Sequence, residues 1–99
     1  MTYLVGKAPV EDFRKWRSTF HDNESYRTEH GERGYQVFQS VDDPNEVIVL
    51  FEWDENKDPR AFFESKEMRE IMAEAGLRGR PDITEVELVD QKPAQQPSA

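Results

Sequence analysis

Two histidines are the side chains best suited to proton transfer in this chain of 99 residues. His21 lies in residues 10–30, which contain no glycine or proline and are expected to form a helix. It sits about 80 degrees around the axis from the middle of the apolar stripe, at the edge of any cleft beside that stripe. Because imidazole titrates near neutral pH, His21 could accept a proton from an acidic phenol or enol; a surface histidine is the alternative. We interpret His30, at the end of the segment, as structural.

The apolar stripe of this predicted helix gives way to charge along its length. Phe13, Trp16 and Phe20 recur at helical spacing, and continued spacing brings Glu24 and Arg27 onto the same face. A charge on an inward face requires an ionic partner or a pocket. The alternative is a solvated helix end, since charged residues are rarely buried.

Composition disfavours several other kinds of site. The chain has 13 lysines and arginines against 21 aspartates and glutamates, a net charge of −8, and without a basic cluster nucleic-acid binding is disfavoured. There is no cysteine, and two histidines nine residues apart give no zinc pattern, so we expect no metal site. Residues 42–46, which hold three carboxylates, lack the spacing of a calcium loop.

The longest apolar stretch, residues 47–51, is too short to cross a membrane, and we expect a cytoplasmic protein.

The hydropathy pattern predicts four strands and two helices in the order β-α-β-β-α-β. Asp58 and Pro59 are suited to begin the second helix, and Gly31 and Gly76 are suited to end the two helices. Residues 42–45 are typical of a hairpin turn. We expect strands at residues 2–7, 35–41, 46–53 and 83–89, and helices at residues 10–30 and 59–75.

One residue of the second helix does not fit its pattern. The predicted inward stripe consists of Ala61, Ser65, Met68, Met72 and Ala75. Phe63 falls on the opposite side, so it either contacts another subunit or the helix has a different phase.

This element order has a simple solution, the ferredoxin-like α+β fold. Right-handed crossovers place both helices on one face of a four-stranded antiparallel sheet and leave the other face bare. Strand 46–53 is apolar on both faces, and an exposed apolar sheet face marks an interaction surface. We therefore predict a homodimer joined through the sheet faces. Residues 1–90 form the single domain, and residues 91–99 are predicted to be a disordered tail.

Several stretches also carry a family resemblance. They are Trp16-x-x-x-Phe20, Gly34-Tyr35-Gln36-Val37-Phe38 leading into Asp42-Asp43-Pro44-Asn45-Glu46-Val47, Leu50-Phe51-Glu52-Trp53-Asp54, Met68-Arg69-Glu70 and Ala75-Gly76. Together they resemble the antibiotic biosynthesis monooxygenase-like (ABM) family. The resemblance covers residues 3–89 and implies the dimeric α+β barrel of that family.

For activity, the resemblance implies a reaction class. Relatives on this fold include cofactor-independent oxygenases, haem-degrading enzymes and isomerases. Similarity to the cofactor-independent oxygenases implies a polycyclic phenol or quinol as the substrate, as in aromatic polyketides. This substrate would be deprotonated in an apolar pocket and would then react with dioxygen, with no cofactor. His21 is the first candidate for the base, and Arg27 or Tyr35 would stabilise the oxyanion. The haem-degrading relatives bind iron through a histidine on the second helix, and residues 57–75 contain none, which counts against haem.

The expected ligand site lies between the helices and the sheet. Its candidate binding residues are Trp16, Phe20, Glu24, Phe51, Trp53, Met68 and Met72. Aromatic walls suit a planar ligand, although core packing explains the apolar residues equally well. The alternative function is a non-catalytic dimeric module that binds a small molecule or only assembles. An open cleft of several hundred cubic ångströms beside His21 would favour the enzyme, and a filled core would favour the module.

Overall fold

The computed structural model describes residues 2–94. Its elements are β1 (Thr2–Pro9), α1 (Phe13–Asp22), α2 (Glu24–Glu29), β2 (Glu32–Gln39), β3 (Glu46–Trp53), α3 (Pro59–Glu64), α4 (Lys66–Glu74) and β4 (Asp82–Val86). The predicted ferredoxin-like α+β order is confirmed, and each predicted helix is divided in two.

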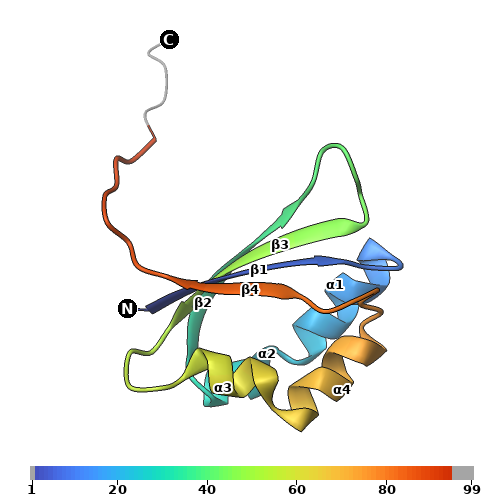
Figure 1. Cartoon of the computed structure of the whole chain (residues 1–99), viewed down its shortest axis with the longest axis horizontal. Coiled ribbons are helices and arrows are strands. Elements are labelled where there is room, and N and C mark those ends of the chain that lie inside the picture. Colours follow the sequence, from blue (N-terminus) through green and yellow to red (C-terminus); the bar gives the residue numbers. More distant parts are fainter. Residues whose placement is uncertain (1, 95–99) are drawn as a thin grey trace.

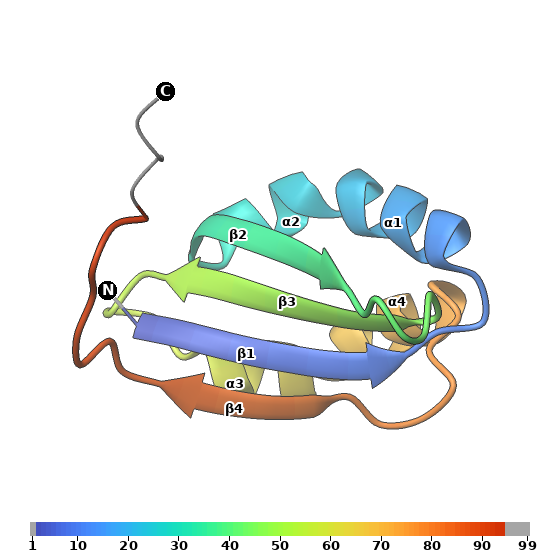
Figure 2. The ribbon, with the colours of Figure 1, turned by 90° about the horizontal axis from the view of Figure 1, so that it is seen from above.

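The four strands form one antiparallel sheet in the order β2-β3-β1-β4 (Figure 2). All four helices lie on one face of it (Figure 1). The side chains of β3 alternate between the two faces: Val47, Val49, Phe51 and Trp53 are buried on the helix side, and the residues between them are half-buried on the other side. The sheet therefore has one covered apolar face and one bare face.

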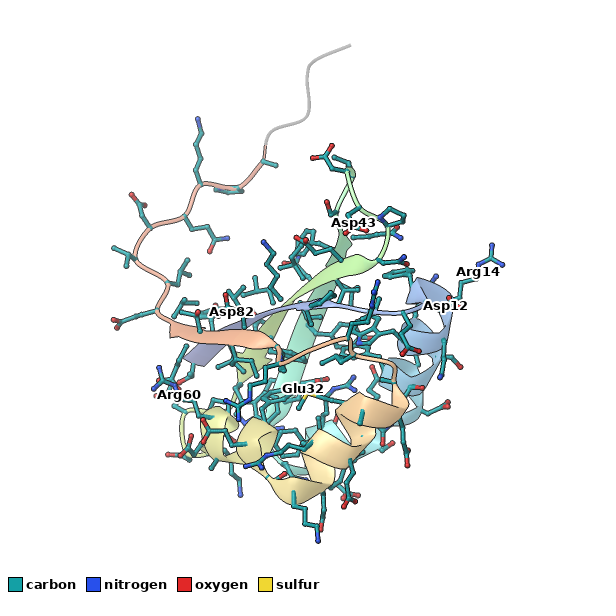
Figure 3. All side chains as sticks on the ribbon, turned by 45° about the vertical axis from the view of Figure 1, so that its right-hand side comes forward. Asp12, Arg14, Glu32, Asp43, Arg60 and Asp82 are labelled. Carbon is teal, nitrogen blue, oxygen red and sulfur yellow. The ribbon has the colours of Figure 1, made fainter. Side chains whose placement is uncertain are left out.

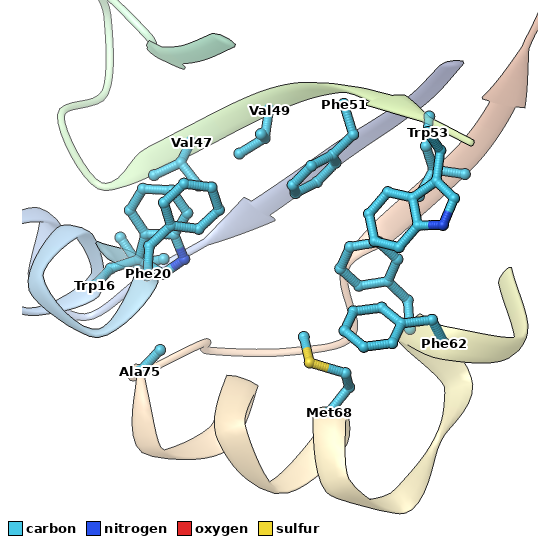
Figure 4. Packing of buried hydrophobic residues seen from close by; sticks show 12 residues of the cluster. Trp16, Phe20, Val47, Val49, Phe51, Trp53, Phe62, Met68 and Ala75 are labelled. Carbon is cyan, nitrogen blue, oxygen red and sulfur yellow. The ribbon is translucent and has the colours of Figure 1, made fainter. Parts of the chain in front are cut away.

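Aromatic side chains from β3 and α3 form the densest part of the core. Trp53 is fully buried, and its ring centroid lies 5.3 Å from that of Phe62 and 5.5 Å from that of Phe63. Phe51 lies 5.1 Å from Phe63. Figure 4 shows the β3 side chains pointing toward Met68 of α4 and toward Ala75, which directly follows α4.

The prediction of one helix over residues 10–30 is wrong, because the helix is interrupted at Asn23. The Asn23 side-chain amide donates a hydrogen bond to the backbone oxygen of Thr19 at 2.9 Å, and such local bonds compete with regular helix geometry. α1 begins after Asp12, whose carboxylate accepts from two backbone N–H groups of the first turn. The end after α2 is as predicted, since Gly31 has a φ of +124°.

The second predicted helix is interrupted at Ser65, whose backbone is extended with a ψ of 152°. The Ser65 hydroxyl donates to the Phe62 carbonyl at 2.7 Å and accepts from the Met68 N–H at 3.3 Å, so it caps α4. The break changes the helical phase: Phe63 is buried in the core and Ala61 is exposed. The prediction of one continuous inward stripe that includes Ala61 is therefore wrong. For Phe63, the alternative that the helix has a different phase is the one that the structure supports.

The structure also describes how α4 ends and where the chain runs afterwards. Gly76, with a φ of +87°, and Leu77 donate to the Ala73 and Met72 carbonyls, which is the predicted closing motif. β4 ends at Val86, earlier than predicted. Residues 87–94 are exposed, form no helix or strand, and lead away from the sheet on the side opposite the helices (Figure 1). The rest of the predicted tail, residues 95–99, lies outside the described residues.

Candidate functional site

A cavity of about 80 Å³ lies between the helices and the covered face of the sheet. Apolar side chains make most of its wall: Leu4, Ala8, Trp16, Phe20, Val47, Val49, Phe51, Phe63, Met68, Ile71, Met72, Ala75, Leu77, Pro81 and Ile83. Half-buried residues of α4 and β4, such as Met72 and Ile83, belong to this wall, so the cavity reaches the surface there. Its volume is far below the several hundred cubic ångströms that the enzyme hypothesis expected.

Thr19, Asn23 and Arg27 give the cavity a polar edge. They follow one another at intervals of four residues, which places them along one side of the α1–α2 segment. Lys7 also borders the cavity, but strand alternation directs its side chain to the bare face, where it forms an ion pair with Glu46 at 3.2 Å. Among the residues that the structure describes, Arg27 is thus the one whose charged side chain points toward the cavity.

Three contacts fix the guanidinium of Arg27, whose side chain is 2% exposed. Its Nε donates to Glu32 Oε2 at 2.5 Å, and its Nη1 donates to the backbone oxygen of Phe20 at 2.6 Å. Its Cζ also lies 3.7 Å from the centroid of the Phe20 ring, a cation–π geometry. Nη2 is buried and has no hydrogen-bond partner among the described residues.

Glu32 is the buried anion that partners Arg27. It stands at the start of β2, and its side chain is 4% exposed; Figure 3 shows it inside the molecule, whereas the other labelled charged residues lie at the periphery. Burial raises the pKa of Glu32 above its ordinary value of 4.5, because it outweighs the opposing hydrogen bond and charge of Arg27. The predicted inward charge at Arg27 is therefore paired across the turn between α2 and β2.

Tyr35 and Glu24 interact with each other rather than with the cavity. Neither residue lies on its wall. Burial, and then a hydrogen bond to the Glu24 carboxylate, raise the pKa of Tyr35, so its hydroxyl stays protonated as the donor in this bond. The Tyr35 ring contacts Phe20 edge-on, with centroids 4.9 Å apart. Tyr35 therefore supports a wall residue from behind, and Glu24 is exposed rather than inward-facing.

His21 is exposed on α1 and is not part of the cavity wall. Its ring centroid lies 6.2 Å from that of Phe20, a residue of the wall. The role of His21 as the base remains a prediction, and its exposed position outside the cavity wall does not favour that role. His30 follows α2, and its Nδ1 donates to the Tyr26 carbonyl at 2.8 Å, in keeping with a structural role at a helix end.

Five of the seven predicted binding residues lie on the cavity wall: Trp16, Phe20, Phe51, Met68 and Met72. Trp53 and Glu24 do not. Whether the five bind a ligand stays a prediction. Thr19, Asn23 and Phe63 also lie on the wall but were not predicted from the sequence as site residues, although the four-residue spacing of Thr19, Asn23 and Arg27 was a usable signal.

The bare face of the sheet carries a groove with both apolar and polar side chains. Tyr3, Leu50 and Val86 line it together with Tyr35, Gln36, Glu52 and residues 87–91. Phe38 is 50% exposed and Val86 is 37% exposed.

Within residues 2–94, no helix is long and apolar enough to span a membrane. In the same range, no three His, Asp or Glu side chains are grouped to hold a metal ion.

Comparison with known proteins gives one family and many similar folds. The antibiotic biosynthesis monooxygenase family matches residues 8–74, and no curated protein matches the chain. SnoaB, a cofactor-independent oxygenase from Streptomyces nogalater, is 13% identical, with a TM-score of 0.73 over 94% of this chain and 97% of SnoaB. A candidate antibiotic biosynthesis monooxygenase from Bordetella bronchiseptica is 12% identical, with a TM-score of 0.73 over 89% of this chain and 96% of that one. A protein of unknown function from Nitrosomonas europaea is 19% identical, with a TM-score of 0.67 over 95% of both chains. At these identities the solved structures show a shared fold.

Proposed function

Because the chain belongs to the antibiotic biosynthesis monooxygenase family, we propose that it oxidises a small hydroxylated aromatic compound with dioxygen in the cavity. The observation that carries this proposal is the cavity itself, whose apolar wall includes four aromatic side chains and whose polar groups lie along one edge. Such an arrangement suits a planar ring with oxygen substituents on one side. The similar fold of a cofactor-independent oxygenase supports a reaction in which the substrate supplies all the electrons.

The proposed reaction balances without a reductant or a cofactor. The phenol or quinol loses a proton, and the electron-rich ring carbon forms a bond to one oxygen atom of dioxygen. The resulting hydroperoxide loses the one hydrogen on that carbon and breaks its O–O bond, which leaves a carbonyl there, so that the phenol becomes a quinone, and releases the second oxygen as water. Four electrons pass from the substrate to dioxygen. The protein binds and orients the substrate and excludes bulk water.

Cavity size favours a single-ring substrate over the polycyclic one that the family resemblance implied. A cavity of about 150 Å³ holds benzene, and this one measures about 80 Å³. Met68 and Met72 lie on its wall, and methionine side chains change conformation readily. A single ring therefore requires only local movement, whereas fused rings require the helices to separate from the sheet.

The test is oxygen uptake with a panel of single-ring and fused-ring phenols and quinols. Ala75→Leu fills the cavity, because Ala75 is buried on its wall, and should lower turnover at least tenfold. Ala73→Leu, on the exposed side of α4 two residues earlier, is the matched control and should keep the parental rate. Turnover that survives Ala75→Leu would place the reaction elsewhere.

His21→Ala tests the candidate base separately. Since His21 is exposed and outside the cavity wall, we expect the parental rate. A positioned general base contributes about 10²-fold or more, so a loss of that size would assign the base role to His21 after all.

We also propose that a second copy of the chain covers the bare sheet face. ABM proteins are typically dimeric, and this face exposes the apolar side chains of Phe38 and Val86, beside polar groups such as the Lys7–Glu46 ion pair. Light scattering should give about twice the chain mass of 11.6 kDa. Phe38→Lys should weaken the dimer by placing a charge in an apolar interface, and Val41→Lys, fully exposed beyond the strand, is the control. A wild-type monomer at micromolar concentration would exclude this interface.

A second candidate function is a dimeric small-molecule-binding module without catalysis. The small cavity and the position of His21 outside it favour this alternative. The same oxygen-uptake panel separates the two functions: ligands that bind without being oxidised would support the module, and turnover would exclude it.

A further inference from the structure

The charges around the cavity are distributed very differently from those of the whole chain. The chain carries 21 aspartates and glutamates against 13 lysines and arginines. None of the described carboxylates lies on the cavity wall, and the one charged side chain directed toward it is the cation Arg27. In an acidic protein, the cavity wall therefore carries one buried cation and, among the described residues, no carboxylate, and the anion Glu32 lies behind the wall as the partner of Arg27.

The guanidinium of Arg27 still has hydrogen-bond donors to offer. It has five N–H donors; one is used by Glu32 and one by the Phe20 carbonyl. Nη2, with two of the remaining three, has no partner among the described residues although it is buried. Leaving buried donors of a charged group without acceptors costs free energy, so the site is arranged for an acceptor that residues 2–94 do not supply.

We propose that the cavity selects an aromatic ligand in its ionised form, a phenolate, and that Arg27 Nη2 binds its oxygen. This inference rests on the proposed binding of a hydroxylated ring in the cavity and names the state in which the ring binds. A charge-assisted hydrogen bond to a phenolate is stronger than one to a neutral phenol. Asn23 and Thr19, further along the same edge, are positioned to contact additional oxygen substituents of the ring.

Ionisation of the ligand also replaces a base in the protein. No carboxylate or imidazole lies on the cavity wall among the described residues. A phenol whose ionised form is stabilised by Arg27 can lose its proton to water before or during binding. Glu32 is then a positioning residue, because its bond to Nε holds the guanidinium in place and its charge opposes that of a bound anion.

The experiment uses 4-nitrophenol, whose visible absorption distinguishes phenol from phenolate, bound to the full-length protein across a pH range. We expect the pKa of the bound probe to fall by at least one unit, a tenfold or greater preference for the anion. Nitrobenzene, which has no ionisable group, is the neutral control and should bind more weakly than the phenolate. Binding of the neutral phenol alone, or no binding of the probe, would overturn the proposal.

Three variants assign the effect to Arg27. Arg27→Met combined with Glu32→Leu removes both members of the buried pair, which avoids leaving a lone charge in the core, and should abolish the pKa shift of the probe. Glu32→Gln keeps the cation, removes the opposing charge and should strengthen phenolate binding. Arg33→Met removes a cation that binds Asp54 at the surface and should change nothing. A shift that persists in the double variant, or that weakens in Glu32→Gln, would overturn the proposal.

The outcomes also separate this inference from the proposed function. If 4-nitrophenolate binds through Arg27 but no compound of the panel consumes oxygen, the oxygenase proposal fails and the anion site stands. If the panel is oxidised while the bound probe shows no pKa shift, the anion site fails and the oxygenase stands.

Discussion

Gly31→Ala should be one of the most damaging small substitutions in this protein. Gly31 has a φ of +124°, and a Cβ added there would lie 2.4 Å from Trp53 Nε1 and 2.9 Å from Trp53 Cδ1. The indole is fully buried against Phe62 and Phe63, so it has no free space to move into. Backbone strain costs about 1–2 kcal/mol and overpacking about 1–3 kcal/mol, so the expected loss is about 2–5 kcal/mol.

Two other glycines separate the two contributions. Gly76→Ala carries the backbone strain without the clash, because its φ is +87° but the nearest atom, in Glu11, is 3.7 Å from the added Cβ; we expect a loss of about 1–2 kcal/mol. Gly79→Ala has no atom within 4 Å of the added Cβ and should be close to neutral. The free energies of unfolding come from urea titration followed by far-ultraviolet circular dichroism. If Gly31→Ala costs no more than Gly76→Ala, the contact between Gly31 and Trp53 does not constrain the fold as described.

Three further predictions concern caps and the buried ion pair. Asp58→Ala removes two hydrogen bonds at the start of α3 and should cost about 1 kcal/mol in urea unfolding, whereas Glu70→Ala on the exposed face of α4 should cost little. Arg27→Met alone should cost about 3–5 kcal/mol, because it leaves Glu32 buried without its cation, and far less when combined with Glu32→Leu; equal losses would mean that the two residues are not coupled. Because the pKa of Glu32 is raised in the folded state, its contribution to stability is present below pH 4.5 and is lost as the pH rises through the raised pKa. Glu32→Gln should therefore flatten this part of the stability profile, and an unchanged profile would contradict the assignment.

The sheet was the most predictable part of the molecule, because strand alternation is a local property of the sequence. The bounds of β3, residues 46–53, and its two apolar faces follow directly from its pattern. The closing glycines at 31 and 76 were equally predictable, since few other residues adopt a positive φ. These features depend on a few adjacent residues and not on distant contacts.

The interruptions of the helices were not predictable in the same way. Ser65 and Asn23 are tolerated inside helices, and only their hydrogen bonds to Phe62 and Thr19 turn them into breaks. The misplacement of Phe63 followed from the missed break, because a continuous helix assigns each residue one fixed phase.

The candidate site was predictable in part. Helical spacing placed Arg27 on an inward face, and the structure buries it. The same spacing placed Glu24 inward, but the Asn23 break lies before it and the structure exposes it. The pairing of Arg27 with Glu32 depends on how the chain turns between α2 and β2, which no periodicity describes. The volume of the cavity depends on how closely the helices approach the sheet, and no residue pattern specifies that distance.

The alternation of β3 has a consequence for how proteins of this shape can diverge. Residues 47, 49 and 51 line the cavity, and residues 48 and 50 belong to the opposite face. On the assignments proposed above, mutation at odd-numbered positions changes the ligand that the cavity accommodates, while mutation at even-numbered positions changes the contact with a second copy of the chain. One eight-residue strand would then carry two separately inheritable traits, so a lineage could exchange its ligand while keeping its quaternary structure, or the reverse.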